Sequence, residues 1–157
     1  MVQALRAKMK EQKGFTLIEL LAVIVILGII AAIAIPAIGN VINKSKEKAE
    51  VQDALLIINA AKLYVADKQP AADILLTIDG TVKKTDSVTA VASLDSYIDR
   101  VKDEGFQVKV TQTTATDGTI KYSYSIINHD AVPVVDSTKT TKDAGYVTEK
   151  QLSSYKK

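Results

Sequence analysis

The pattern of hydrophobic and polar residues divides the chain into an apolar N-terminal segment and a longer part of ordinary polarity. No charged or polar side chain occurs from Leu20 to Ile35. As a helix, residues 15–35 would be roughly 31 Å long, which matches a bilayer hydrocarbon core of about 30 Å. The pattern therefore predicts a membrane-inserted helix near the N-terminus.

Three other interpretations of this segment compete with a functional membrane helix. A cleaved secretory signal peptide would explain the basic residues at the N-terminus and the Ala32-Ile33-Ala34 pattern. However, the apolar run exceeds the usual length of about 7–15 residues, and Glu19 lies near its start. A buried core helix is disfavoured because the segment has no polar face. A plain signal anchor without a further role stays open.

The pattern changes to that of an amphipathic helix between Pro36 and Lys68. Apolar residues recur at helical spacing at Val51, Ala54, Leu55, Ile58, Ala61 and Val65. The opposite face is expected to carry Lys46, Glu50 and Asp53. Gln69-Pro70 is predicted to end the helix, which would be roughly 80 Å long if it began at Phe15.

Alternating apolar residues in the C-terminal half predict strands. Residues 105–113 and 119–127 alternate on either side of Asp117-Gly118, which indicates an antiparallel hairpin. Asp79-Gly80 predicts a second tight hairpin turn within residues 74–82. Residues 131–135 predict a third strand, placed at an edge because of Pro133.

A short helix and a polar tail complete the predicted head. Residues 93–103 predict a helix with Ser93 as its cap, and its apolar face would comprise Leu94, Tyr97, Ile98 and Val101. The polar tail from Asp136 is expected either to wrap the sheet or to stay mobile.

The predicted fold class is α+β, with a long N-terminal helix packed on a small antiparallel sheet. The sheet needs the helix face because an isolated hairpin is marginal in water. The expected organisation is a leader at 1–14, a membrane or filament-core helix at 15–36, an amphipathic half at 37–69 and a head at 70–157.

Charge and cysteine content narrow the classes of function. The net charge of +2 and the lack of basic clusters with aromatics argue against a nucleic-acid binder. Residues 1–14 hold four basic and one acidic side chain, so 15–157 retain 16 basic and 17 acidic residues. The chain has no cysteine, which excludes disulfides and cysteine-ligated zinc.

Glu19 is the one ionisable residue within residues 15–35. A carboxylate at the centre of a transmembrane helix costs on the order of 3 kcal/mol, so a partner is expected. An α-amino group created by a cut before Phe15 would lie one helical turn away, because i and i+4 share a face. The same group on a neighbouring chain would serve equally, and the pair would then fix the axial register between chains.

The stretch Lys13-Gly14-Phe15-Thr16-Leu17-Ile18-Glu19-Leu20 resembles the cleavage and methylation motif of type IV prepilins and pseudopilins. The resemblance covers about the first 50 residues. It implies cleavage between Gly14 and Phe15 by a membrane-embedded prepilin peptidase. It further implies N-methylation of Phe15 and a subunit-assembly role for Glu19.

The resemblance also implies a location and partners. The precursor would cross the cytoplasmic membrane of a bacterium once, in contact with lipid, and the mature subunit would join an extracellular filament of its own kind. Minor pilins and inner-membrane assembly machinery would be further partners. Through multivalency, the subunits of a filament could also bind DNA weakly as a collective surface. A start at Met9 instead of Met1 would leave a leader of only six residues.

Gly28 and Pro36 match positions at which helices of this family are often interrupted. Proline inside a helix costs about 3 kcal/mol, and glycine about 1 kcal/mol relative to alanine. The stretch between them is therefore expected to be the weakest part of the helix. A simple kink is expected in the monomer, and local melting in the filament.

No catalytic, cofactor or metal site is predicted. His129 is the single histidine and is expected in a solvated loop. Asp95, Asp99 and Asp103 recur at i, i+4, but they lack the dense oxygen-ligand loop of a calcium site and are expected on a solvated helix face. Lys83-Lys84 and Lys156-Lys157 are too short for a DNA groove.

The leading hypothesis is a non-catalytic structural subunit of a type IV pilus or a related filament, acting in adhesion, motility, DNA uptake or secretion. The alternative is a monomeric, membrane-anchored binding or sensing domain. These hypotheses differ in whether the leader is removed and whether the protein is found in sheared surface fibres. The kind of subunit, a major pilin or a minor pilin or a pseudopilin, stays open.

Overall fold

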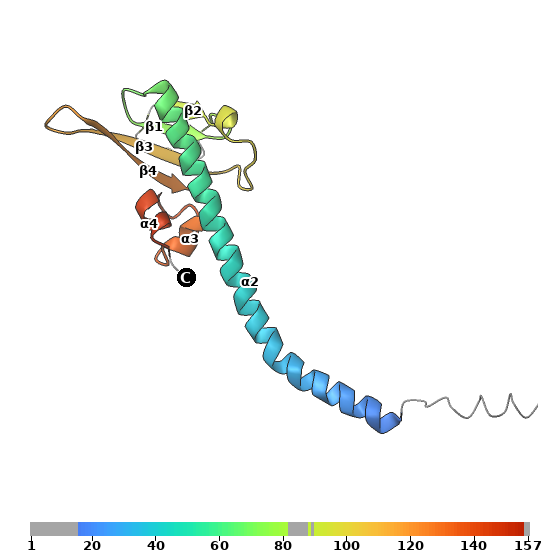
Figure 1. Cartoon of the computed structure of the whole chain (residues 1–157). Helices are drawn as coiled ribbons and strands as arrows, with labels where there is room; N and C mark the ends of the chain where they lie inside the picture. Colours follow the sequence, from blue (N-terminus) through green and yellow to red (C-terminus); the bar gives the residue numbers. More distant parts are fainter. Residues whose placement is uncertain (1–15, 82–87, 89, 156–157) are drawn as a thin grey trace, which may run out of the picture. The chain divides into compact units, whose positions relative to one another are not determined.

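The computed structural model describes residues 16–81, 88 and 90–155. Two compact units are present, Met1–Asn43 and Lys44–Lys157. The helix α2 (Leu17–Lys68) contributes residues to both (Figure 1). Each unit is described by itself.

In the first unit, α2 has no tertiary core of its own. None of residues 16–43 is buried, and their leucine, isoleucine and valine side chains are largely exposed. The helix is assigned without interruption through Gly28 and Pro36. Melting of this stretch in a filament therefore stays a prediction.

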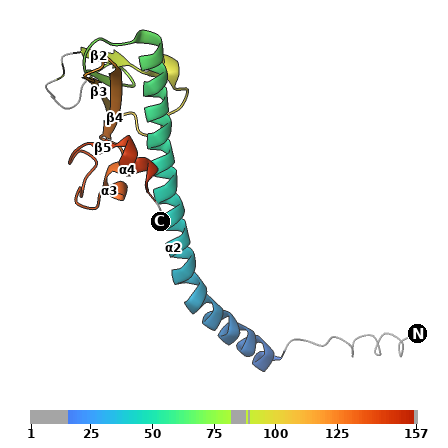
Figure 2. The same ribbon diagram turned by 60° about the vertical axis from the view of Figure 1, so that its left-hand side comes forward.

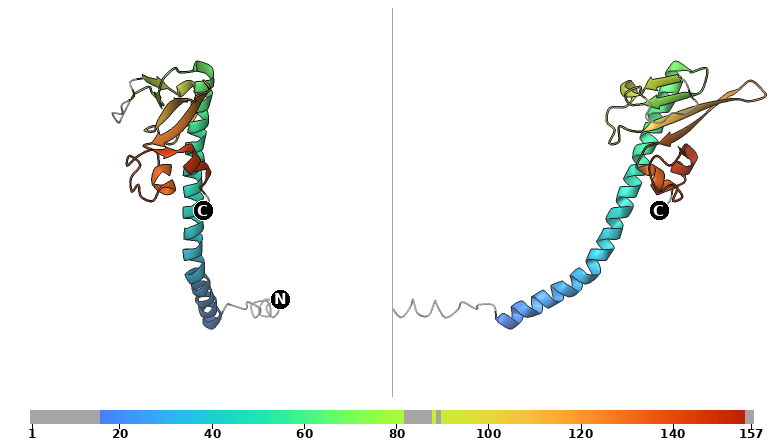
Figure 3. Two further views of the ribbon diagram at one scale, coloured as in Figure 1. Left: turned by 90° about the vertical axis from the view of Figure 1, so that its left-hand side faces the viewer. Right: turned by 180° about the vertical axis from the view of Figure 1, so that it is seen from behind.

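In the second unit, α2 buries an apolar stripe against the head. The predicted positions Val51, Ala54, Ile58, Ala61 and Val65 are all buried, and Leu55 is half-buried. Ile57 and Ala60 are buried too, so the stripe is wider than predicted. Figure 3 shows the sheet lying against one side of this part of the helix.

The predicted end of the helix is confirmed. α2 ends at Lys68, and Gln69 adopts a left-handed φ of 44°. Because proline disfavours helical geometry in the residue before it, Pro70 prevents the helix from continuing. The Tyr122 hydroxyl donates a hydrogen bond of 3.2 Å to the Pro70 carbonyl and so holds the chain after the helix to the sheet.

The head contains a five-stranded sheet with the strand order β2-β1-β3-β4-β5. Its strands are β1 (Ile74–Thr77), β2 (Ala90–Ser93), β3 (Gln107–Thr114), β4 (Ile120–Ile127) and β5 (Val147–Thr148). The predicted hairpin is confirmed as the antiparallel pair β3–β4. Gly118 has a φ of 82° in its turn, which glycine adopts without a Cβ penalty. The α+β fold class is confirmed.

The hairpin predicted around Asp79-Gly80 is wrong. A turn is present, since Gly80 has a φ of 74° and the Asp79 carboxylate accepts a hydrogen bond from the Thr81 amide. However, β1 pairs with β2 in parallel, and residues 82–87 lie outside the described residues. All four residues of β1 are buried because the strand lies between β2 and β3.

The helix predicted for residues 93–103 is also wrong. β2 ends at Ser93, and a single 3-10 turn, η1, covers Asp95–Tyr97. The Tyr97 hydroxyl donates a 2.6 Å hydrogen bond to Asp67, and its ring meets Tyr64 edge to face. These contacts hold the segment against the end of α2, and the chain then turns extended at Ile98.

The strand predicted for residues 131–135 is a helix, α3 (Ala131–Val135). Pro133 is its third residue, where the missing amide hydrogen costs nothing because the first four amides of a helix have no helical partner. Ala131 and Val132 are buried, which explains the apolar run that suggested a strand.

The polar tail packs against the head. β5 pairs with β4, and the short helix α4 (Glu149–Ser153) follows it, with Leu152 buried (Figure 2). The Tyr155 hydroxyl donates a 2.8 Å hydrogen bond to Glu47 on α2. Burial and this hydrogen bond raise the pKa of Tyr155 to about 12. Of the two outcomes left open for the tail, wrapping is the observed one.

Candidate functional site

Glu19 forms a capping box with Thr16 at the start of α2. The Glu19 carboxylate accepts hydrogen bonds from the Thr16 amide at 2.9 Å and from the Thr16 hydroxyl at 2.8 Å. In return, the Glu19 amide donates to the Thr16 hydroxyl oxygen at 3.3 Å. The motif satisfies donors that the first turn of a helix otherwise leaves open.

Thr16 is a partner of Glu19 that was not predicted from the sequence. An ionisable partner was expected, whereas Thr16 supplies two neutral donors from three residues away. The Thr-x-x-Glu spacing before an apolar run is itself the sequence signature of a capping box and could have revealed the contact. The consequence is that the carboxylate has a defined orientation within a single chain.

The apolar surface that follows Glu19 is exposed over its whole length. Its large apolar side chains are 45–87% exposed, at Leu17, Ile18, Leu20, Leu21, Val23, Ile24, Val25, Ile26, Leu27, Ile29, Ile30, Ile33, Ile35, Ile38, Val41 and Ile42. Among the described residues, α2 is the one helix long and apolar enough to cross a membrane. A patch of this size on a protein marks an interaction with lipid or with other protein surfaces.

The other residues predicted for this site differ in whether the structure describes them. Gly14 and Phe15 lie outside the described residues, so their proximity to Glu19 is not observed. Gly28 and Pro36 lie within α2, and open space surrounds the position where a Cβ of Gly28 would be. Glycine is therefore not required at this position by packing within the chain.

The prediction of a solvated His129 is wrong. Its side chain is 1% exposed, and Nε2 lies 3.3 Å from an Asp53 carboxylate oxygen. The Ala131 amide donates to Nδ1 at 3.1 Å, so Nδ1 is the acceptor and Nε2 carries the proton that faces Asp53. Asp53, expected on the solvent face of the helix, thus ties α2 to the start of α3.

The surroundings of His129 do not form a catalytic constellation. The ring lines a cavity of about 230 Å³ together with lysine, aspartate, glutamate and alanine side chains. Acyl or group transfer by a histidine base needs a nucleophile within hydrogen-bond reach, and none of the described residues that line this cavity has a hydroxyl or a thiol. The polar groups instead connect elements of the head.

The aspartates that suggested calcium do not share a helix face. Asp95 lies in η1, whereas the Asp103 carboxylate accepts hydrogen bonds from the Gly105 amide at 3.1 Å and from Lys142 at 3.0 Å. Across residues 16–81, 88 and 90–155, no three acidic or histidine side chains are placed to hold a metal ion. Lys83-Lys84 and Lys156-Lys157 lie outside the described residues.

The chain matches one family model and several known proteins. The family model of the prokaryotic N-terminal methylation motif matches residues 9–35. The type IV major fimbrial protein FimA of Dichelobacter nodosus is 37% identical over 116 residues, covering 68% of this chain and 71% of that protein.

Two further relatives are matched over shorter stretches. Fimbrial protein Q of Moraxella bovis is 40% identical over 93 residues, covering 53% of this chain and 59% of that protein. Type II secretion system core protein G of Aeromonas hydrophila is 33% identical over 90 residues, covering 57% of this chain and 61% of that protein. The chain thus spans less than two thirds of these two relatives. No solved structure matches the chain.

Proposed function

This chain belongs to the type IV pilin family, and we propose that it is a structural subunit that polymerises through α2 into a pilus or a related filament. The observation that carries the proposal is the exposed apolar surface of residues 17–42, interrupted by no charge after Glu19. Such a surface is stable in lipid before assembly and against other copies of itself afterwards.

Before assembly, the subunit spans the cytoplasmic membrane once, with its basic leader on the inner side. A prepilin peptidase cuts between Gly14 and Phe15 and methylates the new amino group of Phe15. The match to the N-terminal methylation motif supports this step. Because Gly14 has no side chain, it leaves the backbone accessible to the protease.

During assembly, the Glu19 carboxylate meets the amino group of Phe15 on a neighbouring subunit. The capping box supports this role because it holds the carboxylate at the first turn of the helix. Thr16 keeps its amide hydrogen after cleavage before Phe15, so processing leaves both donors to Glu19 in place. In hydrocarbon, a carboxylate without a counter-charge is costly. Any axial register between subunits that leaves Glu19 unpaired is therefore disfavoured.

The mature subunit has no catalytic activity of its own in this proposal. Its partners are other copies of itself, minor pilins, the prepilin peptidase and the inner-membrane assembly machinery. The filament lies outside the cell, and residues 15–36 form its core. The stretch from Gly28 to Pro36 is the part of the helix that melts in the filament, since Pro36 removes a helical hydrogen bond and Gly28 has a low helix propensity.

The test compares Glu19→Ala with Glu104→Ala in cells that assemble the filament. Glu104 is an exposed glutamate of the head, so its replacement removes the same charge elsewhere. We expect Glu19→Ala to be processed at Gly14 and to remain in the membrane fraction, while Glu104→Ala pellets with sheared filaments. Normal filaments from Glu19→Ala would exclude the pairing. A wild-type protein that keeps its leader and never pellets would instead favour a monomeric anchored domain.

A further inference from the structure

A hollow of about 590 Å³ lies in the head between the last turns of α2 and the β3–β4 hairpin. Its size is within the usual range of small-ligand sites, about 300–1,000 Å³. Gln69 and Pro70 line it from the end of the helix, and Gln112 and Tyr122 line it from the hairpin. The proposed assembly through the apolar surface of residues 17–42 does not use this hollow.

Tyr122 offers an aromatic surface to the hollow. Its hydroxyl donates a 3.2 Å hydrogen bond to the Pro70 carbonyl, so the ring is held in place before a ligand arrives. Among the described residues, no other aromatic ring and no cation stacks on it. The residue is half-buried, so part of the ring stays open. A sugar ring carries C–H groups on its face, and these pack well on an aromatic ring.

Two glutamine side chains supply polar groups to the same hollow. The side-chain amides of Gln69 and Gln112 make no hydrogen bond to any other described residue, and only their backbone amides are bonded. Each side-chain amide offers both donors and an acceptor. A hydroxyl group also donates and accepts, so the hydroxyls around a sugar ring match these two amides.

Gln69 stands where glycine is the usual residue. Its backbone amide donates to the Val65 carbonyl at 2.9 Å, and its φ of 44° is the left-handed conformation that ends many helices. A Cβ is unfavourable in this conformation, so glycine would end the helix at a lower cost. What glutamine adds is its side chain, which lines the hollow. Backbone strain of this kind is concentrated at functional sites.

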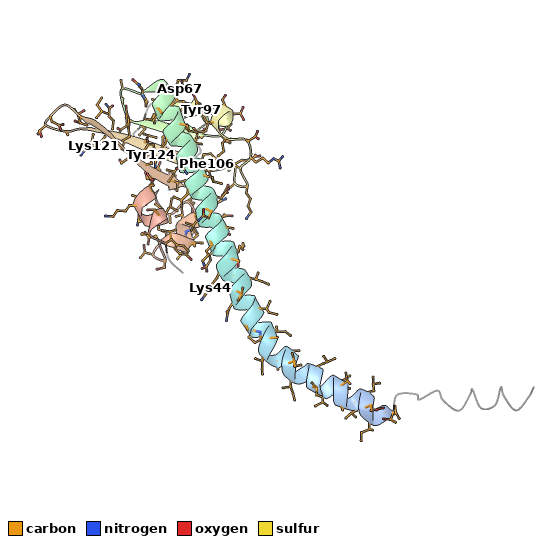
Figure 4. All side chains as sticks on the ribbon, viewed as in Figure 1. Lys44, Asp67, Tyr97, Phe106, Lys121 and Tyr124 are labelled. Atoms are coloured by element: carbon orange, nitrogen blue, oxygen red, sulfur yellow. The ribbon has the colours of Figure 1, made fainter. Side chains whose placement is uncertain are left out.

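The charges around the hollow favour an uncharged ligand. Among the described residues that line it, Lys62 is the one with a charged side chain. Its ammonium group forms an ion pair with Glu149 on α4 and lies 5.7 Å from the ring centroid of Tyr124, which Figure 4 marks on the hairpin. Because Glu149 offsets the charge of Lys62, the hollow has little attraction for an anion.

We propose that this hollow binds a neutral sugar ring of a glycan. The C–H face of the sugar packs on Tyr122, and its hydroxyls form hydrogen bonds with Gln69 and Gln112. The site is open to solvent, so a single head binds the sugar weakly, whereas a filament presents many copies and gains avidity. The inference goes beyond filament assembly, and its failure would leave the proposed function intact.

The test uses the full chain reconstituted in phosphatidylcholine nanodiscs, because sugar-based detergents would compete for the site. Saturation-transfer difference NMR with lactose as the probe reports which sugar protons contact the protein. We expect transfer to the C–H protons of one sugar ring, and a several-fold weaker signal with Tyr122→Leu. Gln69→Gly should weaken the signal as much. Because glycine suits this backbone, the thermal unfolding temperature of the head should stay unchanged or rise in that variant.

Matched variants separate the hollow from the rest of the head. Gln112→Ala removes an amide that lines the hollow and should lower the signal several-fold. Gln52→Ala removes an exposed amide elsewhere on α2 and should keep it. Sialyllactose, which adds a carboxylate to the same two sugar rings, should bind no more tightly than lactose.

Three results would overturn this inference. The first is no saturation transfer to either ring of lactose. If Gln69→Gly then also lowered filament yield, the hollow would hold a neighbouring subunit instead of a sugar. The second is a signal that is unchanged in Gln69→Gly and in Gln112→Ala. The third is tighter binding of sialyllactose than of lactose, which would show that Lys62 attracts an anion.

Discussion

The two parts of α2 belong to one helix but have opposite surroundings. From Leu17 to Asn43 none of the described side chains is buried, whereas from Lys44 to Lys68 a stripe of seven residues is buried under the sheet. Both parts are rich in apolar residues. Within the second unit, the head thus supplies an apolar partner for its part of the helix, whereas the described residues of the first unit bury none of their own apolar side chains.

A capping box is found near each end of the described chain. Thr148 and Gln151 form a capping box at α4, as Thr16 and Glu19 do at α2. At α4 the reciprocal group is a neutral amide, which completes the hydrogen bonding of a short surface helix. At α2 it is an acid ahead of an apolar surface, which local capping alone does not require.

The largest effect is expected from removing a side chain of the head's core. Phe106 is 1% exposed and packs in the cluster that contains the buried stripe of α2. Because a large cavity would remain, we expect Phe106→Ala to lower the free energy of unfolding of the head by about 3–5 kcal/mol. Urea denaturation in detergent, followed by tyrosine fluorescence, measures this value.

The matched variant on the first part of the helix is Ile29→Ala. Ile29 is 60% exposed, so its truncation should change the stability of the head by less than about 0.5 kcal/mol. A loss comparable to that of Phe106→Ala would show that residues 17–43 pack on the head after all, and the contrast between the two parts of α2 would be wrong.

A smaller effect is expected at the capping boxes. Thr148→Ala removes the acceptor for the Gln151 amide, so the head should lose about 1 kcal/mol. Thr16→Ala should leave the stability of the head unchanged, because Thr16 contacts Glu19 in the first unit. Instead, it should reduce filament yield by loosening the Glu19 carboxylate. Equal destabilisation of the head by both variants would contradict the different roles of the two motifs.

The smallest effect concerns acid. Hydrogen bonds from Lys139 and then from Thr138 lower the pKa of Asp136 from its ordinary 3.8 to about 2. Because the folded pKa is the lower one, the carboxylate stabilises the head above pH 4, and this contribution is lost as the pH falls through about 2. The stability difference between wild type and Asp136→Asn should therefore shrink between pH 4 and pH 2 in denaturation curves. A difference that does not vary over this range would exclude the linkage.

Much of the fold follows from local patterns in the sequence. The helix end at Gln69-Pro70 and the β3–β4 hairpin were predicted because a proline and an Asp-Gly turn act over a few residues. The parallel pairing of β1 with β2 was not, since it depends on contacts between distant segments. The same limit explains Ala131–Val135, an apolar run too short for periodicity to distinguish a buried helix from a strand.

The candidate site, too, was predicted only in part from the sequence. Glu19 was identified because a lone acid in an apolar run is costly, yet its partner Thr16 was overlooked because that contact is neutral. His129 was placed in solvent because the sequence does not reveal that Asp53, 76 positions earlier, lies beside its ring. Cleavage and methylation concern Gly14 and Phe15, and both remain predictions.

N-terminal sequencing and intact-mass measurement of the protein from sheared surface filaments test the central proposal most directly. We expect a chain that begins at Phe15, carries one methyl group on its α-amino nitrogen and lacks residues 1–14. A full-length chain that begins at Met1 or Met9, is found in membranes and is absent from the filament fraction would contradict it.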